Sequence, residues 1–186
     1  MLRSRLEVSG SGWPPPRNKH RISGVKEELS TDVSWPATAE TLVAMGAPLA
    51  GFRPQASLTP EVALVQGLLF ARTNATLLRA LPVVLARCWR TLDWLRVEQE
   101  ARARGALDTL GMLAELTGLL AEAPELTERA RPWWQPAREA RFFFPTRNSF
   151  DRELAQVRTP AVARKWGFLM NMGEDSFRAL FERHGR

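Results

Sequence analysis

The most constraining feature of this sequence is a long apolar stripe at helical spacing in the middle of the chain. Its positions are Leu77, Leu81, Val84, Cys88, Leu92 and Leu95, separated by steps of 4, 3, 4, 4 and 3 residues. These steps match the α-helical period of about 3.6 residues and place all six side chains on one face. Asn74 is a suitable cap for the start of this helix, Gly105 is a stop, and Pro82 is expected to kink or split it.

Other helix signals flank this stripe. Thr59-Pro60-Glu61 combines a capping residue, a proline at the first helical position and an acid at the positive helix end. The other expected helices cover 34–46, the stretch that follows Gly105, Pro124 to Pro132, and about 149–158, 160–172 and 174–184. Because no sustained alternating β-branched run is present, we expect an all-α fold. The expected architecture is a single helical domain of about six to eight helices built on αα-hairpins.

Residues 1–33 differ in composition from the rest of the chain. They contain Ser9-Gly10-Ser11-Gly12, then Trp13-Pro14-Pro15-Pro16, and then a short basic cluster. Such a segment is typical of a poorly ordered, basic and proline-rich arm. The alternative is an arm that docks on a partner or on phosphate, with Trp13 as its anchor. The helical domain is expected over 34–186, with its central core at 58–130.

The basic residues are concentrated in the C-terminal third. The whole chain has a formal net charge of +6. Residues 131–186 contain 11 basic and 6 acidic residues, whereas 58–130 contain 8 basic and 9 acidic residues. The basic segment also holds most of the aromatic residues of the chain. When arginines are concentrated beside aromatic side chains, either the aromatic side chains complete a hydrophobic core or the two residue types form a binding surface.

Three interpretations of this basic, aromatic segment are open. The aromatic side chains close a hydrophobic core, or they form a docking surface for a protein, or they stack on nucleic-acid bases while arginines contact phosphates. We rank these interpretations in that order. The candidate partner-binding residues are Trp133, Trp134, Arg138, Arg141, Arg147 and, in the arm, Trp13.

Several classes of site are not expected. The only cysteine, Cys88, excludes an intramolecular disulfide, and its place on the apolar stripe favours a buried side chain over a nucleophile. His20 and His184 lie near opposite ends of the chain, so no histidine metal motif is present. No Gly-rich phosphate loop or GxSxG motif occurs. We therefore expect no catalytic residue, no metal and no cofactor. Without an apolar run long enough to span a membrane or a signal peptide, we expect a cytoplasmic protein.

One internal similarity suggests a duplication. The pattern Thr-Pro-x-Val-Ala-x-x-x-Gly-x-Leu occurs at 59–69 and again at 159–169, and a related four-residue segment follows each copy. The hypothesis is that 59–81 and 159–180 are duplicated helical hairpins. Chance similarity in a chain rich in Ala, Leu and Arg is the alternative.

Residues 92–118 resemble a known family. The pattern is Leu92-Asp93-Trp94-Leu95-x-x-Glu98, then Arg102-Ala103-Arg104-Gly105, then Leu110-Gly111-x-Leu113-x-Glu115-Leu116-x-Gly118. It resembles the C-terminal region of AbiEi-type antitoxins. That resemblance implies a bacterial protein that binds a nucleotidyltransferase-type toxin. Members of that family also have a winged-helix DNA-binding domain, a pattern that the first 58 residues of this chain do not show. The stretch Lys165 to Gly173 suggests a defined C-terminal motif.

These observations predict a non-enzymatic protein-interaction module, antitoxin-like in its action. It would bind and occlude a partner protein, with Trp133 and Trp134 as apolar anchors and Arg138 and Arg141 paired with partner carboxylates. The alternative is a nucleic-acid-binding protein or regulator that uses the same basic, aromatic third.

Overall fold

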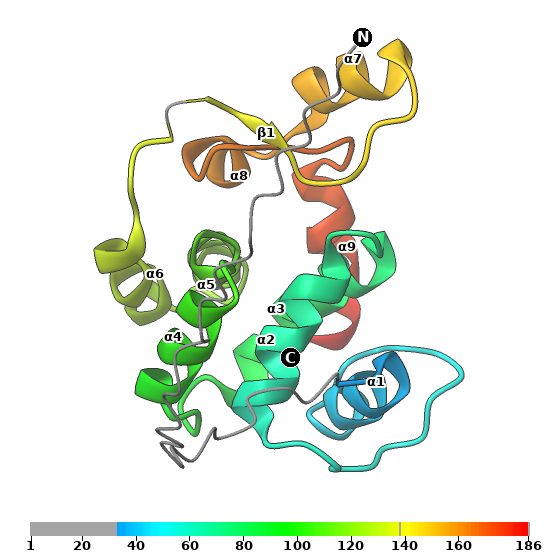
Figure 1. Cartoon of the computed structure of the whole chain (residues 1–186), viewed down its shortest axis with the longest axis vertical. Coiled ribbons are helices and arrows are strands. Elements are labelled where there is room, and N and C mark those ends of the chain that lie inside the picture. Colours follow the sequence, from blue (N-terminus) through cyan, green and yellow to red (C-terminus); the bar gives the residue numbers. More distant parts are fainter. Residues whose placement is uncertain (1–32, 138, 186) are drawn as a thin grey trace, which may run out of the picture. The chain divides into compact units, whose positions relative to one another are not determined.

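The structure is a computed structural model that describes residues 33–137 and 139–185. This part of the chain contains nine α-helices, one 3₁₀ turn and two strands of two residues each (Figure 1). The elements are α1 (Trp35–Ala44), α2 (Pro60–Ala71), α3 (Ala75–Cys88), α4 (Trp94–Ala103), α5 (Leu107–Leu120), α6 (Pro124–Ala130), η1 (Arg131–Trp133), β1 (Arg141–Phe142), α7 (Ser149–Arg158), α8 (Ala161–Lys165), β2 (Phe168–Leu169) and α9 (Glu174–His184). The helical fold class expected from the sequence is confirmed. Of the arm expected over 1–33, all but Val33 lies outside the described residues.

Several helices begin where the sequence provides a capping side chain. The side-chain oxygen of Thr59 accepts a hydrogen bond from the Val62 N–H, and Asn74 Oδ1 accepts one from the Leu77 N–H at 3.0 Å. Asn148 caps α7 in the same way. Each cap satisfies an N–H group that has no partner within its own helix.

The central apolar stripe is divided between two helices. α3 continues through Pro82, which is buried, and ends at Cys88. α4 begins only at Trp94. Asp93 caps it, because Asp93 Oδ1 accepts hydrogen bonds from the N–H groups of Leu95 and Arg96 at 3.1 and 3.2 Å. The expected split at Pro82 is therefore not found. The break falls instead where an aspartate caps a new helix, because this cap competes with continuation of the previous helix.

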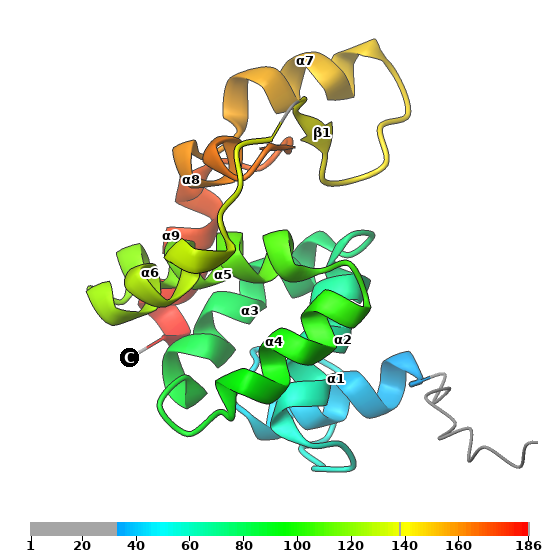
Figure 2. The same ribbon diagram turned by 60° about the vertical axis from the view of Figure 1, so that its left-hand side comes forward.

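The core lies where α2, α3 and α5 are surrounded by their neighbours. α2 packs against α1, α3 and α4, whereas α3 also packs against α5 and α9, and α5 packs against α6 (Figure 2). The fully buried leucines at the centre include Leu64, Leu68, Leu77, Leu81 and Leu110. Burial of each such side chain contributes about 1.5–3 kcal/mol to the hydrophobic stabilisation of the fold.

The C-terminal part departs from the expected succession of helices. The helix expected over 160–172 extends only to Lys165, because Gly167 adopts a positive φ of 75° and the chain then enters β2. β2 pairs in parallel with β1, with Arg141 opposite Phe168 and Phe142 opposite Leu169. Phe168, Leu169 and Met170 form a short, continuous apolar run. Such a run fits a buried helix and a buried strand equally well, so the sequence did not distinguish the two.

The two copies of the Thr-Pro pattern fold differently. Pro60 opens a helix of 12 residues in which Gly67 is an interior position. Thr159 instead follows the last residue of α7, α8 has only 5 residues, and Gly167 lies beyond its end. The duplication hypothesis for 59–81 and 159–180 therefore has no structural support.

Candidate functional site

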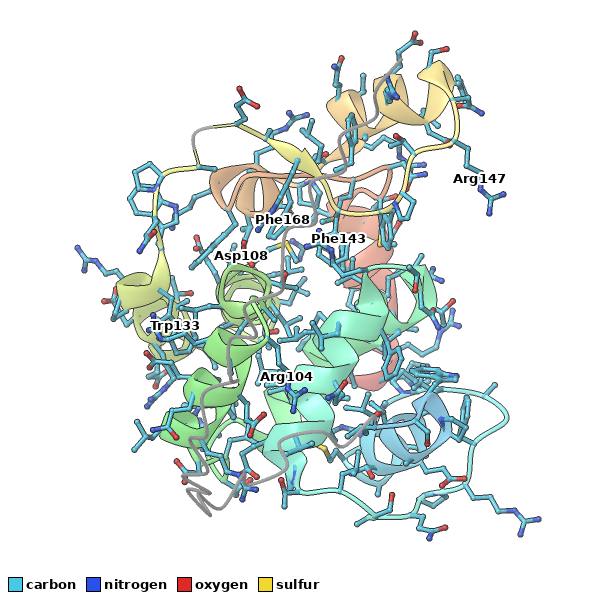
Figure 3. The ribbon with its side chains drawn as sticks, viewed as in Figure 1. Arg104, Asp108, Trp133, Phe143, Arg147 and Phe168 are labelled. Carbon is cyan, nitrogen blue, oxygen red and sulfur yellow. The ribbon has the colours of Figure 1, made fainter. Side chains whose placement is uncertain are left out.

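Of the candidate partner-binding residues that the structure describes, Trp133 and Arg141 line one pocket, whereas Arg147 lies elsewhere. Trp133 lies in η1 and Arg147 precedes α7, and Figure 3 shows them on different sides of the structure, with Arg147 directed outward. Arg147 is exposed, and its backbone N–H donates to Asp151 Oδ2 at 3.0 Å. Trp13 and Arg138 lie outside the described residues. The described members of the predicted set are therefore brought together only in part.

Trp133 is a buried residue, not a free surface anchor. Its side chain is only 8% exposed, and its ring packs against that of Trp94 with centroids 5.9 Å apart. Trp134 is 41% exposed, and its indole Nε1–H donates to the backbone oxygen of Lys165 at 3.1 Å. The interpretation that aromatic residues close a core thus holds for Trp133, while Trp134 keeps part of its ring at the surface.

Arg141 is engaged within the chain. Its guanidinium forms an ion pair with Asp108 and lies 4.7 Å from the centre of the Phe168 ring. The guanidinium of Arg72 lies over the Phe143 ring at 4.9 Å and also over that of Phe168. Burial, and to a lesser extent the charge of Arg141, lowers the pKa of Arg72. These arginines therefore stabilise the fold around the buried phenylalanines.

A network between α5 and α8 joins the two motifs that the sequence singled out. Trp166 Nε1–H donates to Glu115 Oε2 at 2.8 Å, and Lys165 Nζ donates to both carboxylate oxygens of Glu115 at 2.8 Å. Gly111 lies one turn before Glu115, and a Cβ atom there would meet Trp166 Cη2 at 2.0 Å. Gly111 therefore leaves room for the Trp166 ring, and Glu115 accepts the hydrogen bond of its indole N–H. Sequence reasoning found both motifs but had no signal that linked them.

A groove lies between α4 and α6 and ends at η1. Its volume is about 840 Å³, and it is lined by Trp94, Leu95, Glu98, Arg102, Pro124, Glu125, Glu128, Arg129, Pro132 and Trp133. Leu95 is 67% exposed at its edge. The guanidinium of Arg129 lies 5.0 Å from the centre of the Trp94 ring. Hydrogen bonds from Arg102 and from Trp133 hold the pKa of Glu98 below its ordinary value. The groove thus combines an apolar floor with a charged rim.

α7 presents an apolar face to solvent. Phe150 is 62% exposed and Val157 is 82% exposed, and Leu154 between them is half-buried. The spacing of 4 and 3 residues places these three side chains on one side of the helix, whereas Ala155 is the only fully buried residue of α7. We call Phe150, Leu154 and Val157 the α7 stripe. Within the described residues, two of the five exposed large hydrophobic side chains belong to this stripe.

α7 is held at its C-terminal end and packs closely against no other helix of the described part. Thr159, directly after the helix, is buried, and its Oγ1 accepts a hydrogen bond from the Met170 N–H at 2.7 Å while lying within bonding distance of the Ala155 oxygen. Arg158 and Asp175 form an ion pair at 3.8 Å between α7 and α9. In both ribbon views α7 projects from the remaining helices (Figures 1 and 2). The stripe is therefore a fixed, exposed apolar surface.

No chemical centre stands out in the described part of the chain. No group of three or more His, Cys, Asp or Glu side chains is arranged there to hold a metal ion. Burial raises the pKa of the Cys88 thiol to about 12, which disfavours the nucleophilic thiolate. None of the described helices has the length and apolar character needed to cross a membrane.

Comparisons of the chain with protein-family models, with curated proteins and with solved structures gave no match.

Proposed function

We propose that this chain is a non-enzymatic protein-interaction module that presents the α7 stripe to an apolar groove on a partner protein. The observation that carries this proposal is the exposure of Phe150 and Val157 on one face of a helix that is fixed at its C-terminal end. Recognition of an amphipathic helix by a groove uses such anchors at spacings of three and four residues. Contiguous exposed apolar side chains are uncommon on proteins that act alone.

The charges around the stripe indicate the chemistry of the partner. Residues 147–158 contain three arginines, Arg147, Arg152 and Arg158, against Asp151 and Glu153. Arg147 and Arg152 are exposed and form no ion pair within the described residues. A groove with an acidic rim therefore complements this segment, since opposite charges steer association and suppress wrong partners. An antitoxin-like role, occlusion of a nucleotidyltransferase-type toxin, is the specific form of this proposal that the resemblance of 92–118 suggests.

Protein binding is favoured over nucleic-acid binding by the burial of the aromatic residues. Phe143, Trp166, Phe168 and Phe177 lie in the core and have no free ring face for a base. Single-stranded nucleic acids are usually held by exposed aromatic rings together with basic side chains. The exposed rings of the described part, Trp134 and Phe150, lie on different elements rather than on one stacking platform. The exposed arginines would give salt-sensitive contacts with phosphates.

Site-specific photo-crosslinking tests the proposal. A photoreactive residue is placed at Val157 in the full chain, and at Gln156 on another side of α7 as the matched control, with the protein encoded by the neighbouring gene as the probe. We expect a crosslinked complex from position 157 and little from 156. Equal crosslinking from both positions would contradict the proposal. Binding to mixed DNA or RNA that falls steeply with salt, without a position-157 crosslink, would support the nucleic-acid alternative instead.

A further inference from the structure

We infer that the pocket between Arg72 and the loop 142–146 binds the carboxylate of a ligand whose remaining part is apolar. The pocket has a volume of about 390 Å³, and Thr73 completes its lining. We call it the Arg72 pocket. The inference goes beyond the proposed function, because it needs neither the α7 stripe nor a partner protein that covers it.

The Arg72 pocket contains one positive charge and no carboxylate. Arg72 is the only ionisable residue in its lining. By contrast, the groove between α4 and α6, the pocket beside Arg141 and the pocket beside Arg90 each have at least one acidic side chain in their lining. An anion that enters the Arg72 pocket is therefore attracted by Arg72 and meets no like charge, whereas in each of the other three it would meet one.

The Arg72 guanidinium has no counter-ion within the described residues. Its side chain is half-buried and lies over the rings of Phe143 and Phe168, at 4.9 and 5.4 Å from their centres (Figure 3). An aromatic ring attracts a cation but does not neutralise its charge. The neighbouring charge is that of Arg141, another cation, and burial together with this repulsion lowers the pKa of Arg72. A carboxylate bound in the pocket would offset both effects.

A carboxylate fits this pocket better than a phosphate. One guanidinium supplies a single positive charge, and its planar fork of N–H donors matches the two oxygens of a carboxylate. A phosphate monoester carries a charge of about −1.5 to −2 at pH 7 and would need a further cation. Thr146 adds a hydroxyl donor to the pocket, whereas the Thr73 hydroxyl already donates to the Phe70 oxygen at 3.3 Å.

The remaining walls of the pocket favour an apolar body on the ligand. Phe142 and Phe144 are half-buried beside the buried Phe143, and Pro145 is exposed at the rim. Ligand pockets of about 300–1,000 Å³ commonly combine such apolar walls with a few polar groups that orient the ligand. A carboxylate joined to an apolar group would place its charge at Arg72 and its apolar part against the rings. A free organic acid and a peptide that ends in an apolar residue both have this chemistry.

Titration of the full chain, followed by nuclear magnetic resonance, tests the inference. The probes are hydrocinnamate and an acetylated tripeptide that ends in phenylalanine, each compared with its own neutral carboxamide. We expect the acid to bind about tenfold or more tightly than its amide, because hydrogen bonds between charged groups are the stronger ones. The backbone amide shifts should be concentrated at 72, 73 and 142–146. Tighter binding of the tripeptide would identify a chain terminus as the source of the carboxylate, and otherwise the source is a free acid.

Variants of Arg72 test the role of its guanidinium. Arg72→Gln should abolish the preference for the acid over the amide. Arg72→Lys keeps the charge but loses the planar fork, so it should bind the acid less tightly than the wild type while still preferring it to the amide. Arg90→Gln is the matched control, since Arg90 also lies over an aromatic ring, that of Trp89 at 4.5 Å, but beside a pocket with an acidic side chain. Circular dichroism checks that the variants fold.

Four results would overturn the inference: no binding of either acid, equal affinities of acid and amide, shifts centred outside the Arg72 pocket, or acid binding that Arg72→Gln leaves unchanged. If Arg72→Gln does not fold, the wild-type comparison of acid with amide and the Arg72→Lys variant still decide. Failure here would leave the proposed function intact, because the photo-crosslink from Val157 does not depend on the Arg72 pocket.

Discussion

The indole Nε1–H of Trp166 donates a hydrogen bond to the carboxylate of Glu115 at 2.8 Å, across 51 positions of sequence. This bond fixes α8 to α5. From α8 the chain continues into β2, and the Met170 N–H immediately after β2 is bound by Thr159 at the end of α7. The position of the α7 stripe therefore depends on buried polar contacts at some distance from it.

Loss of the carboxylate at position 115 should destabilise the fold. In Glu115→Ala the Trp166 N–H is left buried without its acceptor, and Lys165 loses its ion partner. We expect the free energy of unfolding to fall by about 1–3 kcal/mol, as for other buried hydrogen bonds to charged groups. Urea unfolding measures it. Glu125→Ala, at an exposed position of α6, is the control and should change it by about 0.5 kcal/mol or less. Equal losses in both variants would contradict the assigned role of Glu115.

A methyl group at position 111 should displace the Trp166 ring. In Gly111→Ala the new Cβ would meet Trp166 Cη2 at 2.0 Å, and we expect a loss of about 1–3 kcal/mol although alanine is the better helix former. Trp166→Phe removes the ring atoms that clash. In the double variant the loss should therefore be smaller than the sum of the two single losses. Additive losses, measured by the same unfolding experiment, would show that the clash is not relieved at Trp166.

Removal of the Thr159 hydroxyl should loosen α7. Thr159→Val keeps the volume of the side chain but leaves the buried Met170 N–H without its 2.7 Å acceptor. We expect amide hydrogen exchange to accelerate in residues 149–158, and much less in α3, because local opening needs less energy than global unfolding. Exchange that accelerates equally in α3 would indicate a loss of global stability instead.

Cys88 should react slowly with alkylating reagents. With its pKa raised to about 12, about one thiol in 10⁴ is ionised at pH 8, whereas an ordinary thiol of pKa about 8.5 is ionised to about a quarter. Alkylation of the native protein by iodoacetamide should therefore be about a thousandfold slower than that of the urea-unfolded chain. A raised pKa in the folded state also means that this group favours folding below pH 8.5, and that its contribution falls as pH rises toward 12. Equal alkylation rates would show that the thiol is not shielded.

The sequence predicted local structure better than it predicted the site. Capping residues such as Asn74 and the apolar period of α3 identify helices because these signals act within a few residues of the helix they specify. The burial of Trp133 against Trp94 depends on contacts between distant elements, and composition alone could not separate a core tryptophan from an exposed one. The spacing of Phe150, Leu154 and Val157 was available in the sequence. Such spacing usually indicates a face that packs against another helix in the core. That no other helix of the described part packs closely against α7 is a property of the whole fold, and the local sequence does not contain it.

The most direct test of α7 as a binding element is the affinity for the neighbouring gene's product, measured by isothermal titration calorimetry. The variant Phe150→Ser/Val157→Ser removes the two exposed anchors, and Ser149→Ala/Gln156→Ser changes two other exposed, uncharged positions on the same helix. We expect the first variant to weaken binding about a hundredfold, since each anchor contributes more than about 1 kcal/mol, and the second to change it less than about threefold. Equal affinities of the wild type and the Phe150→Ser/Val157→Ser variant would contradict the assignment of α7 as the binding element.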